Sequence, residues 1–257
     1  MVYGAAWKAK KLMTDAPSIC LEGSYSFDNV RLFDNIKLEI PAGQWTCLLG
    51  ASGVGKSTIL RLILGLETGG EFEGEITTSD GLGLNEWVSY MAQSDLLLPW
   101  LNVVDNVALG AQLRGEAVDY DRAEQLIERI GLSAHKAKYP NELSGGMRQR
   151  VALGRTLMEK RPIMLLDEPF SALDASTRAD MQELTFEMLA DKTVLLVTHD
   201  PAEAARLGHK IVVLSATEAQ IWDAPKTPPI RDVNAADVVN CQAALLKHLR
   251  GEKNEKN

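Results

Sequence analysis

The chain has 257 residues, of which 46% are apolar and 24% are charged, and its net charge is −8. This composition is typical of a globular protein with one large or two modest domains, and the negative charge disfavours nucleic acid as a partner because no basic excess is available to neutralise phosphates. Three widely spaced cysteines match neither a disulfide framework nor a metal-binding pattern, which favours a reducing compartment.

The sequence also bears on how the chain relates to membranes. No stretch approaches the roughly 18 apolar residues of a membrane span, and residues 1–17 contain no apolar stretch of signal-peptide length. We therefore expect any work at a membrane to be done through another chain.

The N-terminal part of the chain predicts an antiparallel β-subdomain. Residues 19–27 (ICLEGSYSF) alternate between apolar and polar side chains, with Tyr25 and Phe27 on the apolar face. A second strand pattern ends at Ile40, where Pro41 breaks it. Each strand is expected to have one face in contact with solvent.

The remainder of the chain predicts an α/β core. Continuous apolar runs indicate buried parallel strands, covered by helices on both faces, at residues 45–50, 163–167, 193–198 and 211–214. Two intervening helix patterns end at Gly65 and Gly131, and a last helix is expected over residues 235–250. No strand pattern occurs between residues 100 and 155, so we expect a helical subdomain inserted into the core.

The sequence GASGVGKST, residues 50–58, is a phosphate-binding pattern that follows a predicted strand and opens a helix. Its glycines let successive backbone N–H groups point at phosphate oxygens, and the helix N-terminus adds its positive end. Lys56 would reach the β- and γ-phosphates, Ser57 would ligate Mg²⁺ and Thr58 would add a hydrogen bond. The alternative is a glycine-rich turn without a ligand. We call residues 50–58 the glycine-rich loop.

An acid pair, Asp167 and Glu168, ends another apolar strand. The strand ends of an open α/β sheet face the ligand crevice, so both carboxylates are expected near the bound phosphates. Asp167 would hold Mg²⁺, and Glu168 would orient and deprotonate the attacking water. Taken alone, the pair could equally cap a helix, because acidic residues favour first helical turns.

Two further polar residues follow predicted strands. His199 lies after the run at 193–198 and could donate a hydrogen bond to a γ-phosphate, although a lone histidine in such a place is more often structural. Gln93 follows another strand pattern and could reach the metal or the attacking water. Its alternative is an amide that caps a neighbouring loop.

Together these residues resemble the nucleotide-binding subunit of ATP-binding-cassette (ABC) transporters. The resemblance covers residues 18–225, and its motifs in chain order are GASGVGKST, Gln93, LSGGMRQR (residues 143–150), LLDEP, SALD and His199. It implies an α/β fold with a P-loop NTPase (RecA-like) core, an antiparallel β-subdomain and a helical subdomain inserted at about residues 96–155. Residues 226–257 would follow as a C-terminal helix and a disordered tail.

The resemblance also implies an enzyme that hydrolyses ATP with Mg²⁺ as a head-to-tail dimer of two copies. Each of two ATP molecules would lie on the glycine-rich loop of one copy and beneath the LSGG segment (residues 143–146) of the other. A symmetric dimer satisfies both loops twice, which fits a two-fold interface. Asp174, in SALD, would lie across that interface.

The site residues implied in this way fall into three groups. The catalytic group is Glu168, His199, Gln93 and Lys56. The metal ligands are Ser57, Gln93 and Asp167. The nucleotide contacts are Phe27, Gly50, Ala51, Ser52, Gly53, Val54, Gly55, Lys56, Ser57, Thr58, Ser144, Gly145, Gly146 and Asp174. Phe27 matches the family's aromatic platform for adenine by its distance from the glycine-rich loop, and Tyr25 on the same strand face is the alternative, as is a plain strand aromatic for each.

The partners implied are membrane-spanning permease subunits and, through them, a substrate-binding protein. The apolar stretch DLLLPWLNVVDNVALG, residues 95–110, would receive a cytoplasmic helix of the permease, with Leu97, Leu98, Pro99 and Trp100 as candidates. This stretch, together with the segments DEPFSALD and THDPAEA, most resembles the sequences of bacterial importers of nitrate, sulfonates or taurine, or the pyrimidine precursor of thiamine. The chain would then lie peripherally on the cytoplasmic face of the inner membrane.

Other classes fit less well. A non-transport ABC ATPase acting with a soluble partner is the main alternative, but its DNA-repair members insert long coiled coils and its translation members usually fuse two cassettes. A P-loop kinase or GTPase leaves the LSGG segment and His199 unexplained. A cassette without activity is disfavoured because Lys56, Asp167 and Glu168 are all present.

Overall fold

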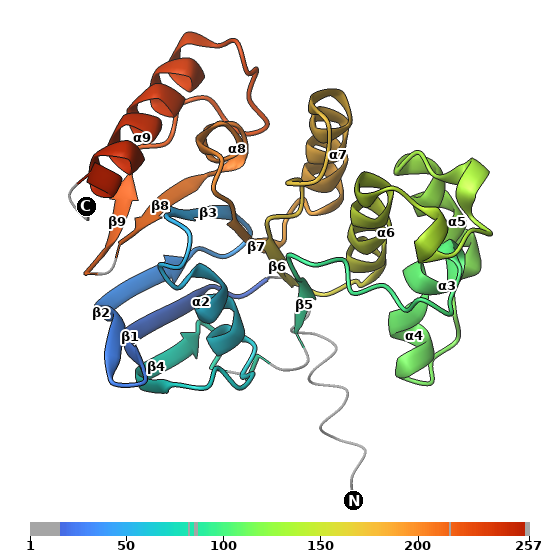
Figure 1. The fold of residues 1–257 in the computed structure, drawn as a ribbon, viewed down its shortest axis with the longest axis horizontal. Coiled ribbons are helices and arrows are strands. Elements are labelled where there is room, and N and C mark those ends of the chain that lie inside the picture. The colour runs from blue at the N-terminus through green and yellow to red at the C-terminus, as the bar shows by residue number, and fades with distance from the viewer. Residues whose placement is uncertain (1–15, 82, 85–86, 216, 255–257) are drawn as a thin grey trace, which may run out of the picture. The chain divides into compact units, whose positions relative to one another are not determined.

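The computed structural model describes residues 16–81, 83–84, 87–215 and 217–254. The N-terminal residues 1–15, where we expect no signal peptide, and residues 255–257 of the expected tail lie outside the described part. The chain forms two compact units (Figure 1). The first comprises residues 1–88, 162–165 and 191–257, and the second comprises residues 89–161 and 166–190.

A three-stranded antiparallel sheet forms the predicted β-subdomain in the first unit. Its strands are β1 (Ile19–Phe27), β2 (Val30–Ile40) and β4 (Glu71–Thr78), in the order β2-β1-β4. The register of β1 against β2 shifts on both sides of Tyr25. Tyr25 is buried, whereas Phe27, the last residue of β1, is 49% exposed, so of these two aromatic residues on the predicted apolar face only Tyr25 is buried.

A six-stranded sheet carries the predicted apolar strands. Its members are β5 (Val88–Met91), β6 (Ile163–Asp167), β7 (Thr193–Val197), β3 (Trp45–Gly50), β8 (Lys210–Leu214) and β9 (Ala219–Trp222), in that spatial order. β3 pairs in parallel with β7 and β8, as predicted, and β9 is antiparallel to β8. Every residue of β3, β6 and β7 is buried, which explains why these strands read as continuous apolar runs.

The helices of the first unit are α2 (Lys56–Ile63), α8 (Pro201–Leu207) and α9 (Ala236–Asn254). α9 packs against α8. The guanidinium of Arg231, just before α9, is buried and donates hydrogen bonds to the carbonyl oxygens of Ala205 and Gly208 at 2.9 and 2.8 Å. The expected C-terminal helix is present, but the expectation of disorder from Gly251 is wrong up to Asn254, because α9 continues to that residue.

The second unit contains the predicted helical subdomain. Its helices are α3 (Val103–Val107), α4 (Leu109–Leu113), α5 (Tyr120–Arg129), α6 (Gly145–Met158) and α7 (Ala175–Met188), with short 3₁₀ helices η1 (Ser133–His135) and η2 (Pro140–Glu142). Residues 100–155 contain no strand, as predicted. α3 and α5 both pack on α6, and Val103, Val107, Leu126 and Ile127 are buried there.

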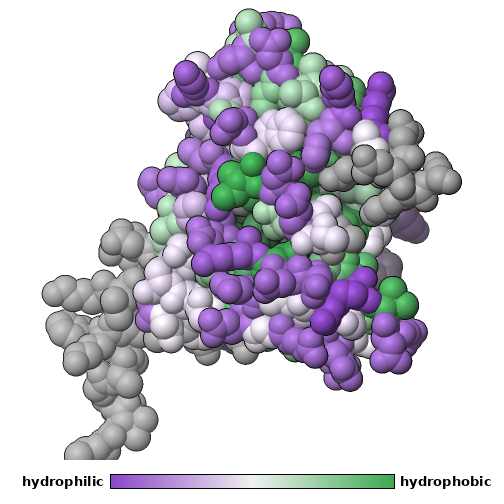
Figure 2. Space-filling model, turned by 90° about the vertical axis from the view of Figure 1, so that its left-hand side faces the viewer, coloured by the Kyte–Doolittle hydropathy of each residue, from purple (hydrophilic) through white to green (hydrophobic). Residues whose placement is uncertain are grey.

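No helix in the described part of the chain is both long and apolar enough to cross a membrane. Figure 2 shows one face of the molecule, on which hydrophilic residues predominate and apolar residues form small separate groups.

Candidate functional site

The glycine-rich loop connects β3 to α2 and has the backbone of an anion-binding turn. Gly53 and Gly55 have φ of +81° and +108°, on either side of Val54, and Gly55 caps α2. Such an alternation lets successive N–H groups face one concavity. At Gly50 a Cβ atom would lie 2.6 Å from the carbonyl oxygen of Leu214, so no larger residue fits there. The local backbone therefore meets the requirements of a phosphate-binding loop.

Lys56 lies at the start of α2 with its side chain folded back over the loop. Its ammonium donates to the carbonyl oxygens of Gly50 and Ala51 at 2.8 and 3.0 Å, and the residue is buried. Ser52, Gly53 and Ser57 are exposed, while Thr58 is half-buried. A positive charge and a hydroxyl group thus accompany the loop's N–H groups.

His199 lies at the same edge of the sheet as the glycine-rich loop. β3 and β7 are parallel with Leu48 opposite Val197, and the N–H of Thr198 donates to Leu48 at 3.2 Å. Two residues after each of these positions the chain reaches Gly50 and His199, and the side chain of His199 is exposed. The sheet therefore presents an imidazole beside the start of the loop.

The two aromatic candidates have different environments. Tyr25 is buried, its ring stacks on Phe33 with centroids 5.7 Å apart, and its hydroxyl donates to the carbonyl of Thr68 at 2.9 Å. Phe27 ends β1 with its ring half exposed. Of the two, Phe27 is the ring with a face available to a ligand.

In the second unit, the acid pair ends β6. Asp167 is its last residue and is only 3% exposed. Glu168 follows in a left-handed conformation with φ of +50°, which is rare for a residue with a side chain. The Gln93 amide donates to Glu168 Oε2 at 3.3 Å. The structure thus brings together two of the predicted catalytic residues, 75 positions apart in the sequence.

The LSGG segment ends at the N-terminus of α6. The Ser144 hydroxyl caps this helix by accepting from the N–H of Met147 at 3.3 Å. A Cβ atom on Gly145 would meet nothing closer than Arg148 Nη2 at 4.0 Å, so its surface is open. Gly145 is exposed. The N-terminus of a fourteen-residue helix, with the positive end of its dipole, is therefore exposed at Gly145.

Asp174 caps α7 in the same manner as Ser144 caps α6. Its carboxylate accepts from the N–H and the hydroxyl of Thr177 at 3.0 and 2.8 Å. These hydrogen bonds lower the pKa of Asp174 below its usual value. Within one chain Asp174 is therefore a helix cap, and a role across an interface remains part of the proposal below.

Two arginines of α6 hold the loop that follows Gln93, which the sequence did not indicate. Arg155 donates to the carbonyl oxygens of Asp95 and Leu96 at 2.7 and 2.8 Å, and Arg148 donates to the Asp95 carboxylate at 3.0 Å. Burial lowers the pKa of Arg155. Leu96 is held in a left-handed conformation with φ of +46°. The loop is thereby attached to the helix that begins at the LSGG segment.

The expected docking segment is only partly exposed. Trp100 and Pro99 are exposed, the former by 69%, and Leu98 is half-buried. Leu97, however, is buried, and Leu96, which we did not expect, is 61% exposed. The left-handed turn at Leu96 explains the exchange, because it rotates that side chain outward.

Gln149 is a further residue that the sequence did not single out by chemistry. Its amide nitrogen, buried on α6, donates to the carbonyl oxygens of Glu168 and Pro169. The only sequence signal was its place in LSGGMRQR, two residues after Met147. It links the helix of the LSGG segment to the acid pair.

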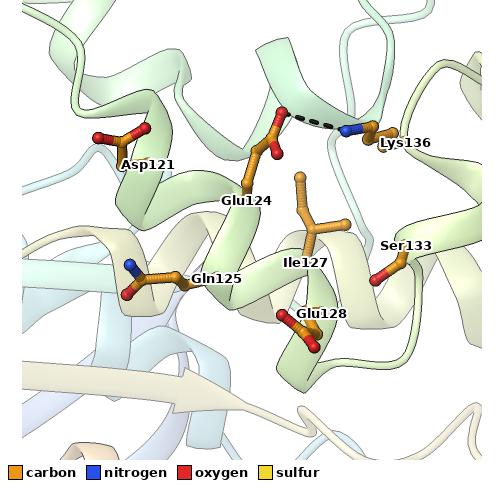
Figure 3. Close-up of a pocket in the computed structure, with 7 residues that line it drawn as sticks. All are labelled: Asp121, Glu124, Gln125, Ile127, Glu128, Ser133 and Lys136. Carbon is orange, nitrogen blue, oxygen red and sulfur yellow. Dashed lines mark hydrogen bonds and ion pairs between the residues drawn. The ribbon is translucent and has the colours of Figure 1, made fainter.

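A separate hollow lies against α5 (Figure 3). Its lining residues are Asp121, Glu124, Gln125, Ile127, Glu128, Ser133 and Lys136. Glu124 and Lys136 form an ion pair at 3.2 Å. None of the predicted site residues lines this hollow, so it is not part of the candidate site.

The predicted metal ligands have the chemistry that Mg²⁺ requires. Ser57, Gln93 and Asp167 offer hydroxyl, amide and carboxylate oxygens, which a hard cation prefers. Among the described residues no group of three or more histidine, cysteine or acidic side chains could hold a metal by itself. This donor set fits an ion that completes its coordination with substrate phosphates and water.

Comparisons with known proteins agree with these features. Residues 33–171 match the family model described as ABC transporter. A Haemophilus influenzae protein described as an uncharacterized ABC transporter ATP-binding protein is 44% identical, over 90% of this chain and 97% of its own length. The aliphatic sulfonates import ATP-binding protein SsuB 1 of Rhodococcus jostii is 43% identical over 74% of this chain and 76% of its own, and its counterpart in Mesorhizobium japonicum is 38% identical over 91% and 92%.

A solved structure has the same fold. It is the dimeric, post-hydrolysis state of the ATP-binding cassette MJ0796 bound to ADP and Pi. Its TM-score is 0.70 at 29% sequence identity, and the match covers 83% of this chain and 99% of that one.

Proposed function

The chain belongs to the ABC transporter family and is an ATPase, and from this premise we propose that it powers an importer of small organic or inorganic solutes, aliphatic sulfonates first among them. The relatives named for sulfonate import support this substrate class. The resemblance of the sequence motifs to known importers favours three other cargoes, namely taurine, nitrate and the pyrimidine precursor of thiamine. The chain acts peripherally at the cytoplasmic face of the inner membrane, with permease subunits and a substrate-binding protein.

The observation that carries the proposal is the hydrogen bond between Gln93 and Glu168. Gln93 opens the loop whose apolar side chains Leu96 and Trp100 are exposed. An exposed apolar patch rimmed by polar residues marks a protein interaction site. A permease helix seated on this patch would therefore sense, and alter, the position of the carboxylate that activates water.

In the proposed reaction each residue has a defined role. The glycine-rich loop and Lys56 bind the ATP phosphates, and His199 donates a hydrogen bond to the γ-phosphate. Glu168 orients the attacking water and accepts its proton, a contribution of about 10²–10⁴ in rate for a general base. Ser57, Asp167 and Gln93 would hold Mg²⁺, which neutralises phosphate charge when bound.

The proposed assembly is a head-to-tail dimer of this chain. The open N-terminus of α6 at Ser144, Gly145 and Gly146 covers the γ-phosphate of ATP bound to the other copy, and Asp174 lies at the interface. The dimeric state of MJ0796 supports this arrangement. ATP binds the closed dimer more tightly than separate chains, so binding drives closure and hydrolysis releases it.

The membrane partner is tested by affinity purification of the tagged full-length chain from detergent-solubilised membranes. We expect an equimolar multi-spanning protein, and we expect Trp100→Asp to lose it. Leu113→Asp is the matched control, because Leu113 is 75% exposed in the same unit but lies outside the patch. A soluble partner alone would contradict transport and favour the non-transport ATPase.

The chemistry and the cargo are tested separately. Glu168→Gln is expected to lower ATP turnover by about 10²-fold or more while ATP binding persists. In cells that lack the native chain, uptake of a labelled aliphatic sulfonate is expected with the unchanged protein and not with Glu168→Gln. Uptake of another cargo, with sulfonate excluded, would correct the substrate class and leave the ATPase assignment intact.

A further inference from the structure

Gln149 lies on α6, one helical turn after the glycines of the LSGG segment, and is 6% exposed. Its Nε2 atom donates to the carbonyl oxygen of Glu168 at 3.1 Å and to that of Pro169 at 3.0 Å. A side-chain amide nitrogen carries two hydrogens, so each carbonyl receives one. A buried amide that serves two consecutive carbonyls fixes the orientation of the peptide between them.

That peptide follows a strained backbone position, Glu168. Glu168 has φ of +50°, a conformation that residues other than glycine adopt only where their surroundings impose it. Its carbonyl oxygen also accepts from the hydroxyl and the N–H of Ser171 at 3.0 and 3.3 Å. Of these three donors, Gln149 alone comes from another element, since Ser171 lies three residues along the same loop.

We propose that Gln149 is a positioning residue for ATP hydrolysis, which acts by holding the main chain of Glu168 in the left-handed conformation that aims its carboxylate. The inference rests on the proposed role of Glu168 as the base. Because Gln149 and Gly145 share one helix, this contact also conveys the position of the LSGG segment to the base. Gln93, by contrast, donates a hydrogen bond to the carboxylate of Glu168 itself.

The decisive variant is Gln149→Met in the full-length chain, which keeps the side-chain volume close to that of glutamine and removes both donors. We expect kcat to fall by about 10–100-fold, the scale of a small misplacement of a catalytic group, with the KM for ATP changed less than about twofold. Gln149→Glu, with the same shape but an acceptor in place of the donor, is expected to lose at least as much.

Thr156→Val is the matched control. Thr156 lies on the same helix, is buried, and donates to the carbonyl of Ala152 at 2.9 Å, within α6 itself. Its loss should lower stability in thermal unfolding and leave kcat unchanged. An equal loss of kcat in this control would show that any weakening of α6 slows the reaction, and would overturn the proposal.

The readout specific to positioning is non-additivity with Glu168→Gln. If Gln149 acts through the base, Gln149→Met will not lower the residual single-turnover rate of the Glu168→Gln chain any further. An equal additional loss in that background would assign Gln149 a purely structural role. Full activity of Glu168→Gln would instead remove the base assignment itself, and wild-type turnover by Gln149→Met beside an inactive Glu168→Gln would remove only the role of Gln149.

Discussion

His209 accepts a hydrogen bond that only a neutral imidazole can accept. Its Nδ1 takes the N–H of Trp45 at 3.1 Å, at the start of β3. Burial first, and the charge of Arg231 second, lower the pKa of His209 below its ordinary value of 6.5. The folded chain therefore binds this proton less readily than the unfolded chain does.

The sign of the pH dependence follows from this shift. Above about pH 6.5, His209 is neutral in both the folded and the unfolded chain. As the pH falls below that value, the unfolded chain binds the proton first. The free energy of unfolding therefore decreases until the pH passes the lowered pKa of the folded chain. His209→Gln keeps an acceptor that does not titrate. Chemical denaturation between about pH 8 and pH 5 should show that the free energy of unfolding depends less steeply on pH in the variant than in the unchanged chain. An equal dependence on pH would show that His209 does not cause it.

At the scale of a single element, α6 contains a glycine in its middle. A Cβ atom on Gly154 would lie 3.0 Å from the Cδ1 atom of Ile130 and 3.5 Å from Val107. Glycine thus permits close packing of α6 on its neighbours, at a helix-propensity cost of about 1 kcal/mol relative to alanine. The two effects oppose each other.

The balance can be measured with a double-mutant cycle. Gly154→Ala alone should change the free energy of unfolding by less than about 1 kcal/mol, because the propensity gain is offset by displacement of the Ile130 methyl group. In an Ile130→Val background, which lacks Cδ1, the same substitution should gain about 1 kcal/mol. Urea denaturation measures the free energy of unfolding of each variant. An equal change on Gly154→Ala in both backgrounds would mean that the contact with the Ile130 Cδ1 atom does not oppose the substitution.

The N-terminus of α6 allows the fold and the assembly to be separated. Because Gly145 is exposed and the nearest atom to a Cβ built there is Arg148 Nη2 at 4.0 Å, Gly145→Glu should leave the fold intact. An acidic residue also suits a first helical turn. The carboxylate would nevertheless repel a phosphate of the partner's ATP.

We therefore expect Gly145→Glu to unfold at or above the temperature of the unchanged chain and to stay monomeric with ATP. Light scattering in a Glu168→Gln background, where ATP is retained, measures the assembly. Tyr120→Glu is the control, since Tyr120 occupies the corresponding first position of α5. An ATP-dependent dimer of Gly145→Glu would contradict the proposed arrangement.

At the scale of the whole molecule, the segment after residue 225 is part of the first compact unit. Arg231 donates to main-chain carbonyls of α8 and of its following turn, and Val238 and Leu245 of α9 are buried. Each such aliphatic side chain contributes about 1.5–3 kcal/mol when buried. We propose that residues 226–254 are required for stability of the ATPase fold.

Two truncations test this. Removal of residues 226–257 should lower the unfolding temperature markedly or prevent folding, whereas removal of residues 252–257 should have little effect because they follow the buried part of α9. An unchanged unfolding temperature of the longer truncation would contradict the proposal that residues 226–254 stabilise the fold.

Periodicity sufficed for the buried strands and for the helical insertion, because each leaves a local pattern in the sequence. It could not place Leu96 outward and Leu97 inward, since that depends on a left-handed residue held by Arg155 from a distant helix. The same limit applies to Phe27, which the strand pattern places with Tyr25 on the apolar face but which is half exposed where it ends β1. No pattern in the sequence marks Arg231, and only the folded chain shows that its side chain is buried.

Glu168 and the LSGG segment belong to one compact unit, joined through Gln149. In the proposed dimer, however, they serve different nucleotides, the chain's own and its partner's. A displacement of this unit would therefore move catalytic groups at two nucleotide sites at once. Hydrolysis by the assembled pair is expected to be cooperative, with a sigmoidal dependence on ATP concentration, because each chain carries half of both sites.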